Sequence, residues 1–147
     1  MYLTAVVDVV SRRVLAHKVA ITLEACHARE VIEEAFARYG TPDIVNTDSR
    51  AASSRPLSSR TPCWPRAASS AWTGVGPGET GVFVERVWRS VKYERVYLKA
   101  YDSVGAARTD IAEYFDWYNT GRPHSSLERL TPEHAYVSLL PKLAEAA

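Results

Sequence analysis

Residues 111–136 read IAEYFDWYNTGRPHSSLERLTPEHAY, and this stretch predicts two helices joined by a polar loop. The first helix is expected to begin at Asp102 or Ser103, because both residue types cap helices, and to end near Asn119. Its inward side is predicted by large apolar residues at helical spacing, which are Ile111, Tyr114, Phe115 and Tyr118. A Thr-Pro pair near the end of the stretch marks the second helix, since proline fits the first helical position.

The residues before this stretch predict another helix, over about 82–98. Its apolar side is marked by Val84, Val87, Val91 and Val96. Its charged side has residues at steps of three and four, namely Glu85, Arg89, Lys92 and Arg95. Such a helix would bury its valines and turn its charged side toward solvent or a charged partner.

The N-terminal 48 residues predict a β-hairpin, a helix and a short buried strand. The expected elements are strands at 2–10 and 13–21, a helix at 23–39 capped by Thr22 and ended by Gly40, and a strand at 43–47. Asp48 follows the last strand. In alternating α/β sheets, ligands and catalytic groups gather at such strand ends, so Asp48 is a candidate site residue.

The composition indicates one domain of ordinary globular type. The chain has 147 residues, 46% of them hydrophobic, and a formal net charge of +1. These values exclude a wholly disordered chain, a fibrous repeat and a disulfide miniprotein, and no apolar run reaches the length of a membrane span. Cys26 and Cys63 fit no metal spacing, and the four histidines show no ligand spacing. We expect a reduced, cytoplasmic protein without a signal peptide.

Residues 49–81 interrupt this pattern. Ser, Ala, Arg, Pro and Gly fill 24 of the 33 positions, and the segment has no Ile, Phe or Tyr. Because it has few large apolar side chains to bury, we expect a disordered or aberrant middle segment. A flexible linker is one interpretation, although Trp64 and Trp72 are unusual in a linker. The same composition is typical of a GC-rich gene translated in the wrong frame.

Four pieces of the chain together resemble the integrase-type catalytic core of bacterial insertion-sequence transposases, the DDE group. They are AVVDVVSRRVLAHKV (5–19), IVNTD (44–48), FVERVWRSVKYERVY (83–97) and the stretch at 111–136. The most specific feature is the order Tyr-Asn, Arg-Pro-His, Leu and Thr-Pro in the last piece. The resemblance covers residues 1–48 and 82–136. It implies an α/β fold of the ribonuclease-H-like class and a function in DNA integration, recombination and transposition.

The resemblance also implies a site. Asp48 corresponds to the second acidic ligand of the family and Glu85 to the third, on metal ions that are Mg²⁺ or Mn²⁺. Lys92 corresponds to a DNA-contacting lysine, and Arg89 and Arg95 would support it at the phosphate backbone. The expected scaffold behind the site consists of Tyr118, Asn119, Arg122, Pro123 and His124. The implied partners are DNA, as element ends and target, and a second copy or an intact transposase.

Ordinary structural roles compete with these assignments. An aspartate after a strand is most often a turn former or a helix cap, and a glutamate or lysine on a charged helix side is most often solvated. Asp8 also follows a strand, but it sits beside the expected hairpin turn, and in the family that aspartate is not a metal ligand. Without the resemblance, these ordinary roles would be preferred for Asp48, Glu85 and Lys92.

The chain departs from the family in two places. No acidic residue precedes Asp8, so the first catalytic aspartate and its central strand are missing from this sequence. After Asp48, codons permitted for residues 49–54 spell Gln-Gly-Ser-Gln-Phe, the family's pattern, when they are read two bases later. The 36 residues between Asp48 and Glu85 are one more than the family's usual spacing. We therefore hypothesise two compensating frameshifts, as in a pseudogene fragment.

Three interpretations remain open at this point. The first is a transposase catalytic-core fragment that is itself inactive, because a carboxylate and the supporting scaffold are missing. The second is a non-enzymatic remnant that binds DNA or pairs with intact transposase through residues 82–136. The third is a small protein in its own right, with a functional linker at 49–81.

Overall fold

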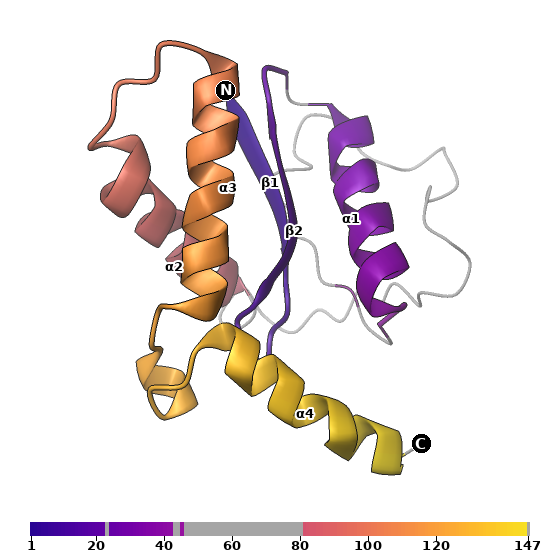
Figure 1. The fold of residues 1–147 in the computed structure, drawn as a ribbon. Coiled ribbons are helices and arrows are strands. Elements are labelled where there is room, and N and C mark those ends of the chain that lie inside the picture. The colour runs from indigo at the N-terminus through magenta and orange to yellow at the C-terminus, as the bar shows by residue number, and fades with distance from the viewer. Residues whose placement is uncertain (23, 43–44, 46–80, 147) are drawn as a thin grey trace.

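The computed structural model describes residues 1–22, 24–42, 45 and 81–146. It is a mixed α/β fold in which a two-stranded antiparallel hairpin lies between helices (Figure 1). In chain order the elements are β1 (Tyr2–Val7), β2 (Val14–Ala20), α1 (Ala25–Tyr39), α2 (Gly81–Val91), the π-helix η1 (Lys92–Val96), α3 (Val104–Thr120), the 3-10 helix η2 (Ser125–Leu127) and α4 (Pro132–Ala146). The predicted hairpin and the helices of both flanks are confirmed within a few residues at their ends, with one difference. The helix predicted over 82–98 is α-helical only to Val91 and continues as the π-helix η1 to Val96.

The turn of the hairpin is held by Asp8. The backbone N–H and the hydroxyl of Ser11 donate to Asp8 Oδ2 at 2.8 and 2.5 Å. Arg12 has a φ of 64°, and its N–H donates to the Asp8 carbonyl at 2.9 Å. Asp8 therefore closes the turn, as predicted for a hairpin residue.

A β-bulge at Leu15 changes the face of the hairpin on which successive side chains of β2 lie. Val6 is opposite Ala16, whereas Val7 is opposite Val14, so Leu15 is the extra residue. Because of this extra residue, Leu15 and Ala16 both pack toward α1. Val14 lies on the opposite face with the other buried residues of the larger core.

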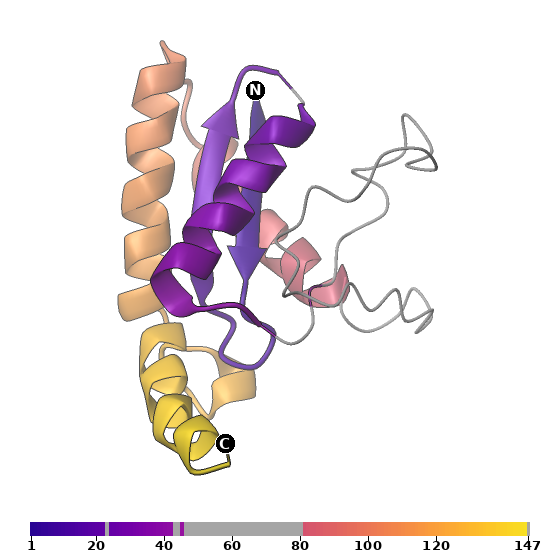
Figure 2. The ribbon, with the colours of Figure 1, turned by 90° about the vertical axis from the view of Figure 1, so that its right-hand side faces the viewer.

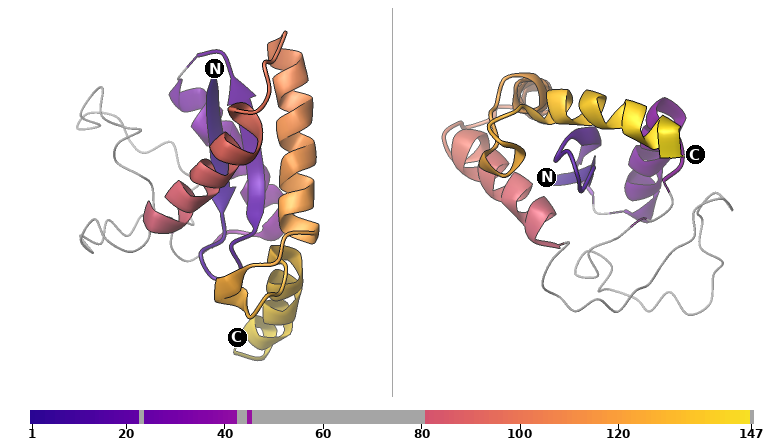
Figure 3. Two further views of the ribbon diagram at one scale, coloured as in Figure 1. Left: turned by 90° about the vertical axis from the view of Figure 1, so that its left-hand side faces the viewer. Right: turned by 90° about the horizontal axis from the view of Figure 1, so that it is seen from below.

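Helices cover both faces of the hairpin. On one face, α1 packs on Ala16 through Val31 and Ala35, and Figure 2 shows α1 lying across the strands. On the other face, α2 and α3 contribute buried side chains to the larger core, and Figure 3 shows these two helices and the hairpin from two further sides. The buried residues of that core are Val14, Val19, Val87, Val91, Ile111, Tyr114, Phe115 and Tyr118. The predicted inward side of α3 is thereby confirmed.

The helix ends follow the predicted caps with one exception. The Ser103 hydroxyl accepts the N–H of Ala106 at 3.1 Å and begins α3, as expected. The predicted cap at Thr22 is wrong, because α1 begins at Ala25 with Glu24 as its N-cap residue. Gly40 ends α1 with a φ of 85°, a conformation that glycine adopts without strain.

Some predictions fall outside the described residues. The expected strand at 43–47 lies there except for Val45, and so do Asp48 and the segment at 49–80. Among the helices that the structure describes, none is long and apolar enough to span a membrane.

Candidate functional site

The exposed side of α2 carries two of the predicted site residues, and η1 begins with a third. Glu85 and Arg89 are one helical turn apart, and Lys92 is the first residue after α2. All three side chains are exposed, whereas Val87 and Val91 are 2% and 1% exposed. The helix therefore buries its valines against the hairpin and presents a carboxylate followed by two cations to solvent.

Arg89 borders a hollow on this surface. The hollow is lined by Arg89, Ser90, Tyr93 and Glu94. The guanidinium carbon of Arg89 lies 5.9 Å from the centroid of the Tyr93 ring, and the rings of Tyr93 and Tyr97 meet edge-on at 5.3 Å. Tyr93 and Tyr97 are both exposed. In such an arrangement the cation can contact a phosphate, and the exposed aromatic rings can stack with bases.

Arg95 lies in a different environment from Arg89 and Lys92. Its side chain is 31% exposed, and Nη1 lies 3.5 Å from Asp110 Oδ1. The guanidinium is also 5.6 Å from the ring centroid of Tyr114. Arg95 is therefore engaged with α3, and the structure does not bring it together with the open side of α2.

Asp110 is a nearly buried carboxylate that joins several segments. It accepts hydrogen bonds from Lys99 and from the Tyr101 hydroxyl, the latter at 2.7 Å. Burial alone would raise the pKa of Asp110, but the hydrogen bonds from Lys99 and Tyr101 lower it below its ordinary value. Burial and the same contact raise the pKa of Tyr101 to about 12. These hydrogen bonds hold the segment between η1 and α3, which contains Lys99 and Tyr101, against α3.

Three of the five predicted tail residues, Tyr118, Asn119 and His124, pack at the end of α3 or contact β2. Tyr118 is buried, Asn119 bonds the backbone of β2, and the ring of His124 meets Tyr118 edge-on at 5.0 Å. His124 Nε2 is buried and has no hydrogen-bond partner in the described part of the chain, and burial lowers the pKa of this residue. Pro123 is exposed.

Arg122 connects this tail to η1. Its guanidinium pairs with the Glu94 carboxylate, and the Tyr114 hydroxyl donates to Glu94 Oε2 at 2.8 Å. Burial would raise the pKa of Glu94, but the hydrogen bonds from Arg122 and Tyr114 lower it. Burial and the bond to Glu94 raise the pKa of Tyr114. Glu94 is consequently an ionised structural carboxylate and not a free acid.

The described residues do not assemble a metal site around Glu85. Asp48, the other predicted ligand, lies outside them. In the part of the chain that the structure describes, one group of three potential ligand residues lies close together, and it is Glu24, Cys26 and His27, at the start of α1. Within the described part of the chain, Glu85 is therefore an exposed carboxylate outside any cluster of three potential ligands.

Sequence reasoning missed three groupings. Glu94 with Arg122 and Asp110 with Arg95 are formed by residues 28 and 15 positions apart, and no local pattern pairs them. The group of Glu24, Cys26 and His27 matches no spacing of cysteines or histidines alone, because one of its three members is a glutamate. Counting glutamate as a possible ligand would have found it, since its members lie within four consecutive positions.

Comparison with known protein families gives one match. Residues 71–132, fewer than half of the chain, match the family model described as integrase core domain. The matched range begins eleven residues before Val82 and contains α2, η1 and α3. Comparison with curated proteins and with solved structures found no significant match. Integrase cores act on DNA and generally use divalent metal ions. Through residues 71–132, the chain is similar to an integrase core domain.

Proposed function

We propose that the chain is a fragment of a transposase catalytic core of the DDE type, with a ribonuclease-H-like origin, and that it binds DNA. The observation that carries the proposal is the exposed series Glu85, Arg89 and Lys92 inside the segment that matches an integrase core. The mixed α/β architecture, with helices on both faces of the hairpin, is compatible with that origin.

DNA binding would involve the open side of α2 and the start of η1. Arg89 and Lys92 would contact phosphates, and the hollow beside Tyr93 offers an aromatic surface next to them. Arg95 contributes less in this proposal, because it is already paired with Asp110.

Catalysis by residues 1–147 is not part of the proposal. Two-metal chemistry depends on several carboxylates held in a fixed geometry. Among the described residues, Glu85 belongs to no group of three or more potential ligands that lie close together. We infer that Asp48 and Glu85 descend from an active site with Mg²⁺ or Mn²⁺, and that this chain carries out no strand transfer.

A second candidate function is a non-enzymatic remnant that binds DNA or pairs with intact transposase. It is favoured by the same observation, since the exposed cations Arg89 and Lys92 can bind DNA without catalysis. Pairing with a second copy or with an intact transposase would be an additional property of this remnant.

The test combines a binding assay and a nicking assay on the purified chain. We expect salt-sensitive binding of a labelled duplex that is unchanged by EDTA, and no nicking of supercoiled plasmid with Mg²⁺ or Mn²⁺. Arg89→Ala should weaken binding, whereas Arg38→Ala on α1 removes the same charge elsewhere and should not. Absence of binding at low salt would contradict the proposal. Metal-dependent nicking that is lost in Glu85→Ala would show an active enzyme instead.

A further inference from the structure

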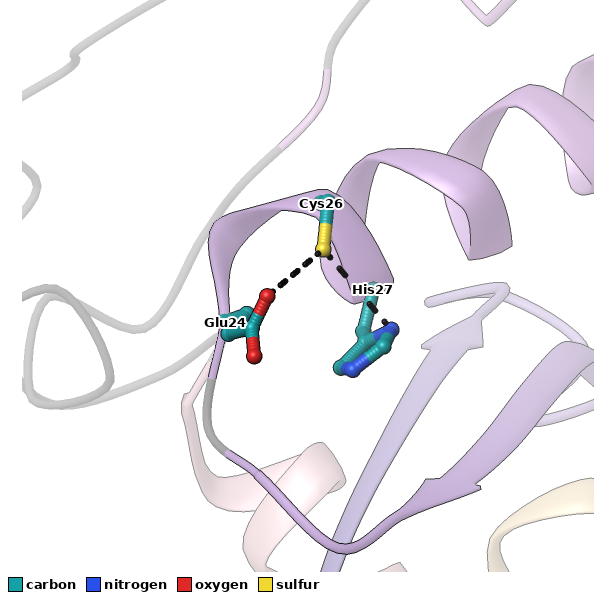
Figure 4. A group of neighbouring side chains, drawn as sticks. All are labelled: Glu24, Cys26 and His27. Carbon is teal, nitrogen blue, oxygen red and sulfur yellow. Dashed lines mark hydrogen bonds between the residues drawn. The ribbon is translucent and has the colours of Figure 1, made fainter.

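Three side chains with metal-ligating atoms converge at the start of α1, on the far side of the hairpin from α2. Figure 4 shows the sulfur of Cys26 between the Glu24 carboxylate and the His27 ring. The Sγ atom lies 3.5 Å from Glu24 Oε2 and 3.9 Å from His27 Nδ1. The ligand atoms of all three residues lie within 4.8 Å of one another.

The two separations from Cys26 Sγ are close to the edge of a zinc coordination tetrahedron. Zinc bonds of about 2.3 Å to sulfur and about 2.0–2.1 Å to nitrogen or oxygen place neighbouring ligand atoms about 3.6 Å apart. The two distances from Cys26 Sγ bracket this value. Small side-chain rotations would therefore bring the three atoms to bonding distance from one ion.

The ring of His27 is oriented for coordination through Nδ1. Its other nitrogen, Nε2, lies 3.4 Å from the Thr22 hydroxyl. A proton on Nε2 directed at that oxygen leaves the Nδ1 lone pair facing Cys26. Ligating histidines in metal sites commonly use their second nitrogen in this way. The ring is held further by its half-buried position, with 22% of its side chain exposed.

The charges around Cys26 and His27 favour binding of a divalent cation at this place. Glu30 Oε2 lies 4.0 Å from His27 Nδ1 and is itself bound by Lys18 of β2. Burial and the neighbouring carboxylates of Glu24 and Glu30 raise the pKa of the Cys26 thiol. A bound dication would offset this repulsion between Glu24 and a deprotonated Cys26 at the N-terminal end of α1.

We propose that Glu24, Cys26 and His27 form a binding site for Zn²⁺, with solvent in the fourth position. Thiolate and imidazole select zinc over magnesium or calcium, which prefer oxygen ligands alone. On binding, Cys26 releases its proton to solvent and the sulfur bonds to the ion. The site is independent of the proposed DNA-binding function and would exist whether or not that proposal holds.

Cobalt provides a direct readout, because Co²⁺ replaces Zn²⁺ and its bond to a thiolate gives a charge-transfer absorption. Titration of the full chain with Co²⁺ should produce this band at one equivalent, and Zn²⁺ should abolish it. Cys26→Ser should remove the band. Cys63→Ser, the matched control at the second cysteine, should leave it unchanged. His27→Ala and Glu24→Gln should each weaken Co²⁺ binding at least about tenfold.

A second measurement does not depend on any variant. Zn²⁺ should slow alkylation of Cys26 at least about tenfold and leave Cys63 unchanged, as measured on the separate peptides by mass spectrometry. Absence of the cobalt band, a band lost through Cys63→Ser, or equal protection of both cysteines would overturn the proposal. A contact between Glu24 and Cys26 that is only a hydrogen bond would give no protection by zinc.

Discussion

The side-chain amide of Asn119 pairs with both backbone groups of Val14. Val14 N–H donates to Asn119 Oδ1 at 2.9 Å, and Asn119 Nδ2 donates to the Val14 carbonyl at 2.9 Å. The two residues are 105 positions apart. The Asn119 side chain thus makes the two hydrogen bonds that a neighbouring strand would make with Val14. These bonds hold the end of α3 against the hairpin.

Removing this amide should destabilise the whole fold. Asn119→Ala leaves the N–H and carbonyl of Val14 without partners in a partly buried place, and we expect a loss of about 1–3 kcal/mol in the free energy of unfolding. Urea denaturation followed by circular dichroism measures it. The control is the neighbouring Thr120→Ala, whose exposed hydroxyl donates to the Asp116 carbonyl of its own helix, and its stability should stay within about 0.5 kcal/mol of wild type. Equal effects of the two variants would contradict the role of Asn119.

Replacement by alanine should have opposite effects on stability at two glycines, Gly40 and Gly105. Gly40 has a φ of 85° and a ψ of 170°, a region that is essentially restricted to glycine. Gly40→Ala should therefore cost about 1–3 kcal/mol, although no atom lies within 4 Å of the added carbon. Gly105 is in the first turn of α3, where an added Cβ meets only Ser103 Oγ at 3.7 Å. Gly105→Ala should stabilise the protein by about 0.5–1 kcal/mol. Thermal or urea denaturation of both variants tests the pair.

The ion pair of Glu94 and Arg122 should make stability depend on pH in the acidic range. The folded-state pKa of Glu94 is lowered from its ordinary 4.5 by Arg122 and Tyr114. The unfolded chain therefore binds the proton more readily. The ion pair makes its full contribution to the free energy of unfolding above about pH 4.5. This contribution is lost as the pH falls through the lower, folded-state pKa of Glu94.

Glu94→Gln isolates this contribution. Near pH 7 the variant should be less stable by about 1 kcal/mol, since both partners are partly exposed and the amide can still accept from Tyr114. The difference between wild type and variant should shrink toward zero at low pH. The comparison with the variant is needed because His17 and His124, whose pKa values are lowered by burial, also affect the pH dependence of wild-type stability. Effects that are common to both proteins cancel when the two free energies of unfolding are subtracted. A difference that stays constant with pH would contradict the assignment.

The sequence was sufficient for features that depend on near neighbours. The inward side of α3, the Ser103 cap and the end of α1 at Gly40 follow from helical spacing and from local backbone preferences. The cap at Thr22 failed because its hydroxyl lies beside His27 Nε2 and α1 begins later, after Glu24.

The candidate site was predictable only in part, because its contacts join distant segments. The exposed positions of Glu85, Arg89 and Lys92 agree with the expected charged side of their helix. The pairing of Arg95 with Asp110 depends on the packing of η1 against α3. In η1, Tyr97 N–H donates to the Lys92 carbonyl at 2.8 Å, five residues back. No spacing rule predicts that wider turn.

The DNA-binding proposal can be tested by the salt dependence of the affinity. Each phosphate contact that is lost lowers the slope of log K against log salt by about 0.9. Arg89→Ala and Lys92→Ala should each reduce the slope by about this amount, whereas Arg95→Ala should reduce it less, because its charge is paired with Asp110. Fluorescence anisotropy of a labelled duplex over a series of salt concentrations measures the slopes. Equal slopes for wild type and the two exposed variants would place the DNA elsewhere on the protein.

The hypothesis of compensating frameshifts concerns residues 49–81 and can be tested in the gene itself. Resequencing the coding DNA and translating all three frames should reveal Gln-Gly-Ser-Gln-Phe directly after Asp48 in the shifted frame, with the original frame restored before Val82. Two inserted bases followed by one more would account for the single extra residue between Asp48 and Glu85. A chain with the repaired frame should then be more resistant to limited proteolysis than the present chain, because it regains large apolar side chains that can be buried. If the shifted frame contains stop codons or no such pattern, residues 49–81 are authentic, and their few large apolar residues are a property of the protein.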